Sequence, residues 1–175
     1  MIRMGLRMLG ILVIFLAACL FGSAMEFQVK KRWMILRELR ELFRFLQKEM
    51  IYHRSPLEEA LLLAAKSGMQ ETGEMLRRIA EEMKKRNGRT FQEIWGQAVT
   101  CCLGNILEPT ALDAVKDAYT ALCNTDVVLQ KVLLEKQENL FEGLCRDAEC
   151  GYREKSGLYR KLGAVGGIFL ILVLL

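Results

Sequence analysis

The side chains best suited to chemistry in this sequence are six cysteines and a single histidine. Thiolates and imidazoles can bind zinc or act as nucleophile and base, but such sites need ligands at characteristic spacings. No two cysteines are separated by the two residues that are typical of zinc and redox motifs. Scattered cysteines in a cytosolic domain usually behave as small buried apolar side chains. The cysteines are Cys19, Cys101, Cys102, Cys123, Cys145 and Cys150.

The histidine, His53, could act as a general base beside Tyr52, but it stands where a helix is expected to end. A cation there interacts favourably with the helix dipole, so a structural role is the simpler interpretation. A metal or enzyme hypothesis that uses Cys101, Cys102 and Cys123 stays open. There is no glycine-rich phosphate loop, and most acidic residues lie one turn from Lys or Arg. The sequence therefore predicts no catalytic, cofactor-binding or metal site, and no enzyme activity.

Charge is balanced between the two apolar ends of the chain. From Glu26 to Lys161 there are 23 basic and 21 acidic residues, a net charge of +2. Nucleic-acid-binding proteins concentrate basic residues on one face, whereas here Lys and Arg alternate with Glu along helical segments. We therefore expect no nucleic-acid partner.

Two apolar segments at the ends predict membrane helices. Met8 to Met25 has 18 uncharged residues, which as a helix span about 27 Å, close to the thickness of a hydrocarbon core. Leu162 to Leu175 has 14, or about 21 Å, and spans fully only if Arg160 and Lys161 extend back to the headgroups. We expect an N-terminal anchor at 1–25, a helical domain at 26–157 and a C-terminal transmembrane segment at 158–175.

Basic residues next to these segments predict their orientation. The N-terminal flank carries only Arg3 and Arg7, whereas the inner flanks, at 30–44 and 153–161, carry ten Lys and Arg residues. Basic flanks stay in the cytoplasm. The central domain should therefore be cytoplasmic and both termini outside the cell membrane.

An alternative interpretation is an exported lipoprotein. Leu16 to Cys19 reads LAAC, which matches a bacterial lipoprotein cleavage signal that would place a lipid on Cys19. Against this, the apolar run continues beyond Cys19 and then meets a dense basic block that would resist export. The anchored domain is the preferred interpretation.

Helical periodicity runs through the central segment, and no part of it alternates as a strand does. We expect a bundle of about six helices. The first carries Ile35, Leu39, Leu42, Leu46 and Met50 as an apolar stripe, ends near His53, and continues from the membrane segment without a break. Ser55 with Glu58, and Thr90 with Glu93, fit capping boxes. The second helix should stop at Ser67-Gly68, and a third, from Glu71 to Arg86, should end at Asn87-Gly88. Gly104 to Pro109 should form the next turn, and a helix from Pro109 through Leu122 should follow it. Asn124 or Thr125 should cap a last helix that can reach the second span.

The segment from Glu49 to Ala60, which reads EMIYHRSPLEEA, resembles the stage III sporulation protein AB family, and the resemblance extends essentially from end to end. It implies a non-enzymatic platform component of a secretion-like channel complex between mother cell and forespore. It also implies similarity to the F-type inner-membrane platform proteins of type II secretion and type IV pilus systems. The implied partners are the secretion-type ATPase of the same operon and other small membrane and ring-forming proteins of the channel. The implied location is the mother-cell membrane around the forespore, and the chain itself could form a homo-oligomer.

Overall fold

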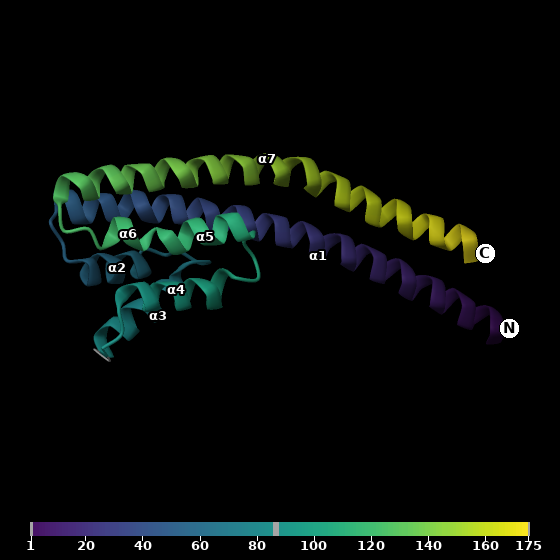
Figure 1. The fold of residues 1–175 in the computed structure, drawn as a ribbon. Coiled ribbons are helices and arrows are strands. Elements are labelled where there is room, and N and C mark those ends of the chain that lie inside the picture. Colours follow the sequence, from purple (N-terminus) through teal and green to yellow (C-terminus); the bar gives the residue numbers. More distant parts are fainter. Residues whose placement is uncertain (1, 86–87, 175) are drawn as a thin grey trace. The chain divides into compact units, whose positions relative to one another are not determined.

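The computed structural model describes the backbone of residues 2–85 and 88–174 (Figure 1), and side chains at 17, 20, 23–85, 88–154, 157 and 165. Every element in this part of the chain is a helix, which confirms the all-α fold class. One of them, η1, is a π-helix. The elements are α1 (Ile2–Gln47), η1 (Lys48–Tyr52), α2 (Leu57–Lys66), α3 (Gly73–Lys85), α4 (Phe91–Leu103), α5 (Pro109–Asp117), α6 (Tyr119–Leu122) and α7 (Val127–Leu174).

The chain divides into two compact units. One comprises residues 1–31 and 148–175, and the other comprises Arg32–Asp147. The expected membrane segments, Met8 to Met25 and Leu162 to Leu175, belong to the first unit, and most of their side chains lie outside the described residues. Within the described part of the chain, no helix combines the length and apolar character needed to cross a bilayer.

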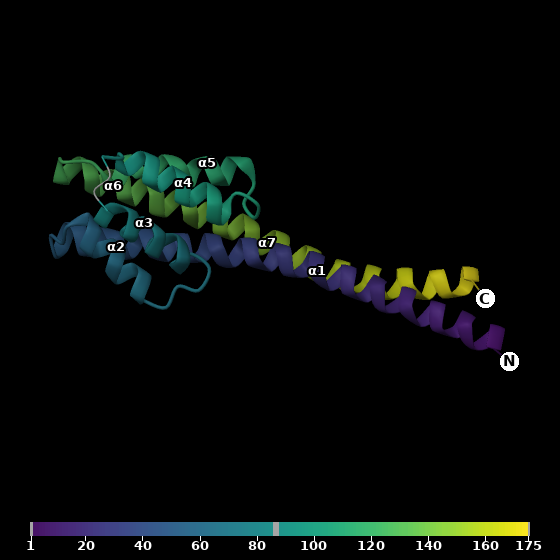
Figure 2. The same cartoon turned by 90° about the horizontal axis from the view of Figure 1, so that it is seen from below.

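In the second unit, α1 and α7 run side by side, and the shorter helices cover one side of this pair (Figures 1 and 2). The rings of Phe43 in α1 and Phe141 in α7 stack with centroids 5.0 Å apart. The apolar stripe predicted for the first helix is buried here, except that Met50 is only half-buried. The side chains of α1 that are fully buried in this core are Ile35, Leu36, Leu39, Leu42, Phe43 and Leu46.

The end of the first helix differs from an ordinary α-helix. Five residues from Lys48 to Tyr52 form a π-helical turn, which the sequence did not predict, and His53 closes it by donating its N–H to the Lys48 carbonyl at 3.3 Å. The predicted end near His53 is confirmed. Arg54 then adopts a left-handed backbone with φ of 55°, a conformation that residues other than glycine rarely adopt.

One predicted capping box is present and the other is wrong. Thr90 and Glu93 cap α4 reciprocally, each side chain accepting the other residue's backbone N–H. At α2 the N-cap is Pro56 and no side chain caps the helix. Ser55 instead donates its hydroxyl to the Glu49 carboxylate at 3.3 Å and its N–H to the Glu49 carbonyl at 3.0 Å. It closes the preceding π-helical turn rather than opening the next helix.

The predicted cap of the last helix is also displaced. Asp126, and not Asn124 or Thr125, accepts the N–H groups of Val128 and Leu129, at 2.9 and 3.4 Å. Asn124 accepts the Asp126 N–H at 2.9 Å and so forms the turn that leads into the cap. Both asparagine and aspartate can make either bond, which is why the sequence alone placed the cap one or two residues too early.

The expected single helix from Pro109 to Leu122 is divided at Ala118 into α5 and α6. The buried indole of Trp95 donates its N–H to the Val115 carbonyl at 2.7 Å. In a continuous helix that carbonyl would accept the N–H of Tyr119, four residues later. Competition for this acceptor accounts for the break.

The remaining boundaries largely follow the sequence. Lys66 ends α2, and Gly68 has a φ of +86°, the left-handed backbone that favours glycine after a helix. The expected helix over Glu71 to Arg86 is observed from Gly73 to Lys85, and residues 86 and 87 lie outside the described residues. Gly104 and Pro109 flank the turn between α4 and α5 as predicted.

Candidate protein interfaces

The cysteines that could have formed a metal or catalytic site are spread over several elements. Cys101 is exposed and Cys102 half-buried in α4, whereas Cys123 is exposed after α6. Among the described residues, no three His, Cys, Asp or Glu side chains are grouped to hold a metal ion. Burial raises the pKa of the Cys102 thiol, and Arg78 partly opposes this effect; burial also raises the pKa of Cys123. Both thiols are therefore held in the protonated form, which is a poor nucleophile.

His53 is exposed at the end of the π-helical turn, between an exposed Tyr52 and an exposed Arg54. Its position matches the expected helix end. The proposed interaction of His53 with the helix dipole stays a prediction. Trp33 is half-buried in α1, and the Arg37 guanidinium carbon lies 6.0 Å from its ring centre.

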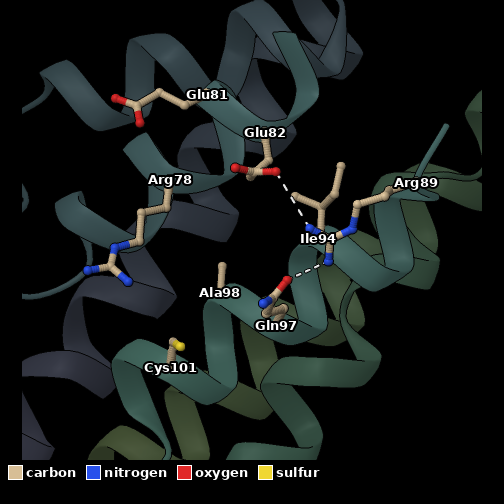
Figure 3. A pocket seen from close by; sticks show the side chains of 8 residues that line it. All are labelled: Arg78, Glu81, Glu82, Arg89, Ile94, Gln97, Ala98 and Cys101. Atoms are coloured by element: carbon tan, nitrogen blue, oxygen red, sulfur yellow. Dashed lines mark hydrogen bonds and ion pairs between the residues drawn. The ribbon is translucent and has the colours of Figure 1, made fainter. Parts of the chain in front are cut away.

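A cleft of about 300 Å³ lies between α3 and α4 (Figure 3). On one side of it, Arg89 hydrogen bonds to Gln97 and pairs with Glu82 at 3.5 Å. Arg78 pairs along α3 with Glu74 at 2.6 Å. The pKa of Glu82 is lowered by its hydrogen bond to Lys85 and by nearby cations. The lining residues are Arg78, Glu81, Glu82, Arg89, Ile94, Gln97, Ala98 and Cys101.

The cleft therefore carries two arginines and two glutamates, and its charges largely compensate one another. No histidine lines it, and among the described residues neither glutamate makes a hydrogen bond with its one thiol, Cys101. A nucleophilic mechanism needs a base within hydrogen-bonding reach of the nucleophile. This arrangement suits a polar contact with another molecule better than acid–base or nucleophilic chemistry.

A carboxylate that the sequence analysis did not single out holds the start of α3. Glu38, in α1, accepts the backbone N–H groups of Gln70, Glu71 and Thr72 and also the Thr72 hydroxyl, at 2.8 to 3.2 Å. Thr72 is fully buried. These N–H groups lie just before α3, which begins at Gly73, and the distant carboxylate satisfies them. The sequence gives one indication that a distant residue holds this segment, which is that no capping box precedes Gly73.

A second long-range contact joins α1 to the turn before α5. Arg32 pairs with Glu108, the N-cap residue of α5, through a hydrogen-bonded ion pair. With Glu38, this contact fixes the starts of two short helices on α1. Neither contact reaches a cleft, so both are interpreted as structural.

The largest concentration of exposed apolar side chains in the second unit lies on α7. Among the described residues of this unit, seven large apolar side chains are exposed, and two of them, Tyr52 and Leu63, lie outside α7. The other five are Val127, Val128, Leu129, Val132 and Leu140. On the opposite side of the same helix, Leu134 and Phe141 are fully buried. The sequence identified these residues as apolar but not which of them face outward.

Comparison with known proteins gives a consistent result. The family model described as "Stage III sporulation protein AB" matches residues 7–175. A solved structure titled "Stage III sporulation protein AB" is similar with a TM-score of 0.63 and 19% sequence identity, over 70% of this chain and 97% of the other. At that identity the structural likeness supports the fold alone. No curated protein sequence matches.

Proposed function

Because this chain belongs to the stage III sporulation protein AB family, we propose that it is a non-enzymatic membrane platform component of the sporulation channel complex. In this proposal it couples a cytosolic secretion-type ATPase to the membrane assembly between mother cell and forespore. The observation that carries the proposal is the family match over 169 of the chain's 175 residues.

The membrane part of the proposal places one span at each end of the chain, over Met8 to Met25 and Leu162 to Leu175. Large apolar side chains are exposed near the chain ends of α1 and α7, and exposure of such side chains to water is unfavourable. Leu20 and Phe27 in α1 are 68% and 63% exposed, and Val165 in α7 is 62% exposed. Contact with lipid removes this surface from water, which supports spans in these regions.

The platform part of the proposal places the helical domain in the cytoplasm of the mother cell, with both termini outside. Ten basic residues on the inner flanks, against two at the N-terminus, support this orientation. The α3–α4 cleft and the exposed side of α7 offer surfaces for other proteins, and the described residues offer no assembled catalytic set. The proposed ATPase partner comes from the family resemblance.

Topology is tested by cysteine labelling in intact protoplasts with a membrane-impermeant thiol reagent, using variants that keep one cysteine each. Cys101 and Cys123 are exposed and should react only after permeabilisation. Cys145 is 5% exposed and controls for unfolding, because it should react in neither case. Reaction of Cys101 before permeabilisation would place the domain outside the cell and overturn the platform function.

The partner is tested by deleting the gene and by binding. A deletion strain should lose heat-resistant spores, and the full chain in detergent should retain the purified ATPase on an affinity column. Normal sporulation of the deletion strain would contradict the function. A bound lipid on Cys19, found as added mass in the intact full-length protein, would favour the lipoprotein alternative.

A further inference from the structure

One side of α7 combines exposed apolar side chains with a single cation. Val128, Val132, Lys136 and Leu140 follow one another at intervals of four residues, so they form one row along the helix. All four are exposed, and Val128 is exposed to 74%. Leu129 lies beside this row and is also exposed. These five residues are here called the outer row of α7.

The outer row lies opposite the side of α7 that packs in the core. Gln130, Leu134 and Phe141, on that inner side, are buried, and the Gln130 side chain donates to the Leu122 carbonyl at 3.2 Å. In Figures 1 and 2 the shorter helices lie on one side of the α1–α7 pair. The inner side of α7 therefore packs in the bundle, whereas the side chains of the outer row are exposed in the described part of the second unit.

The charges around the outer row indicate what could cover it. Glu135 hydrogen bonds to Gln47 of α1 at 3.2 Å and lies 3.9 Å from the Lys131 ammonium group. Lys136 forms no ion pair with any described residue. The row thus presents valine and leucine on both sides of one lysine whose charge has no counterpart among the described residues.

We propose that the outer row of α7 binds an amphipathic helix of another protein, which places a carboxylate opposite Lys136. Rows of side chains at intervals of four pack into the grooves of a facing helix. Residues 128 to 140 rise by about 18 Å, enough to contact about three turns of such a helix. A second copy of this chain fits less well, because Glu135, the carboxylate beside the row, is already held by Gln47 and Lys131.

This inference rests on the proposed role of the chain as a platform for other proteins, and the first experiment separates the two. Full-length Val132→Asp and Lys136→Glu variants replace the native protein in sporulating cells. Each should lower the count of heat-resistant spores at least about tenfold, as loss of a central contact does at an interface. The control variants are Gln92→Asp in α4 and Lys84→Glu in α3, which introduce the same acidic residues at exposed positions outside the outer row. Strains that carry them should sporulate normally.

The outcomes are distinct. A deletion strain that sporulates normally overturns the proposed function, and the inference with it. A defective deletion strain combined with normal Val132→Asp and Lys136→Glu strains overturns the inference alone. Equal defects in the control variants also overturn it, because the effect would then not belong to the outer row.

A second experiment does not depend on a variant that weakens binding. A photo-crosslinking amino acid replaces Val132 in the full chain in sporulating cells, and Asp113, exposed on α5, is the matched control position. We expect crosslinks from position 132 to a peptide of another protein with apolar residues three and four apart and Asp or Glu between them. Crosslinks only to this same chain or only to lipid would overturn the proposal. A crosslinking yield at position 132 no higher than at position 113 would also overturn it.

Charge exchange then tests the contact with Lys136. Changing the acidic residue of the crosslinked peptide to lysine should restore spore counts in the Lys136→Glu strain and not in the Val132→Asp strain. Restoration of neither strain would show that Lys136 does not face that carboxylate.

Discussion

At the level of single residues, the contact made by Glu38 is the clearest example of a role that local sequence does not reveal. Its carboxylate accepts three consecutive backbone N–H groups and one hydroxyl from a segment more than 30 residues away. Hydrogen bonds to a charged acceptor stabilise more than neutral ones. The residue joins the start of α3 to α1, and only the tertiary structure brings the two together.

We expect Glu38→Ala to lower the free energy of unfolding by about 2–3 kcal/mol, because it leaves half-buried N–H groups without their charged acceptor. Urea unfolding of the full chain in detergent, followed by circular dichroism, measures the change. Glu41→Ala on the same helix removes an exposed carboxylate that pairs with Arg37, and should change stability by less than about 0.5 kcal/mol. Equal effects of the two variants would contradict the assigned role of Glu38.

Ser55 and Thr90 give a second comparison at this level, because both fit the capping-box pattern and only Thr90 caps a helix. Thr90→Ala should cost about 1 kcal/mol of stability, as the loss of an N-cap usually does. Ser55→Ala should cost less, since it removes one side-chain hydrogen bond of 3.3 Å to Glu49. The same urea titration compares them, and a larger effect at Ser55 would show that it caps α2 after all.

At the level of elements, local patterns predicted the existence of the helices better than their ends. The stripe from Ile35 to Leu46 was predicted because burial of one helix face produces apolar residues three and four apart. The break at Ala118 was not predicted, because it results from a bond between Trp95 and Val115, which belong to different helices. The outer row of α7 was also missed, since apolar residues cover both sides of that helix and periodicity cannot tell the core from a binding face.

The Trp95 bond makes a prediction about α5 and α6. Trp95→Phe keeps most of the apolar volume and removes the indole N–H, so the Val115 carbonyl becomes available to the Tyr119 amide. We expect a loss of about 1 kcal/mol of stability together with slower hydrogen exchange at Tyr119. Gln92→Ala, at an exposed position of the same helix, is the control. Unchanged exchange at Tyr119 would show that this bond does not cause the break.

At the level of the whole molecule, α1 and α7 each contribute to both compact units, since α1 covers Ile2–Gln47 and α7 covers Val127–Leu174. The sequence predicted the continuity of α1 from the lack of glycine and proline between Glu26 and Tyr52, and it allowed α7 to reach the second span despite Gly143 and Gly151. The proposed function requires force or displacement to pass between the domain and the membrane. Helices that continue from one unit into the other are suited to that task because packed, rigid elements can carry such motion.

We therefore expect an insertion of Gly-Ser-Gly-Ser after Glu26 to abolish sporulation while the helical domain keeps its stability. The flexible insert interrupts α1 inside the first unit, between the expected membrane span and the second unit. An insertion of seven helix-forming residues, close to two full turns, keeps the helix continuous and its faces nearly aligned, and should retain most activity. Spore counts and the urea midpoint are measured for both. Normal sporulation with the flexible insert would exclude coupling through α1.

The stacked pair of Phe43 and Phe141 has a consequence for how the protein is made in the cell. The two rings are 98 positions apart in sequence, so the partner of Phe43 leaves the ribosome only after most of the chain has been translated. At about 5–20 residues per second, α1 waits roughly 5 to 20 seconds with Leu42, Phe43 and Leu46 uncovered. A nascent chain that stalls before α7 would therefore keep an aggregation-prone surface exposed until the last helix closes the bundle.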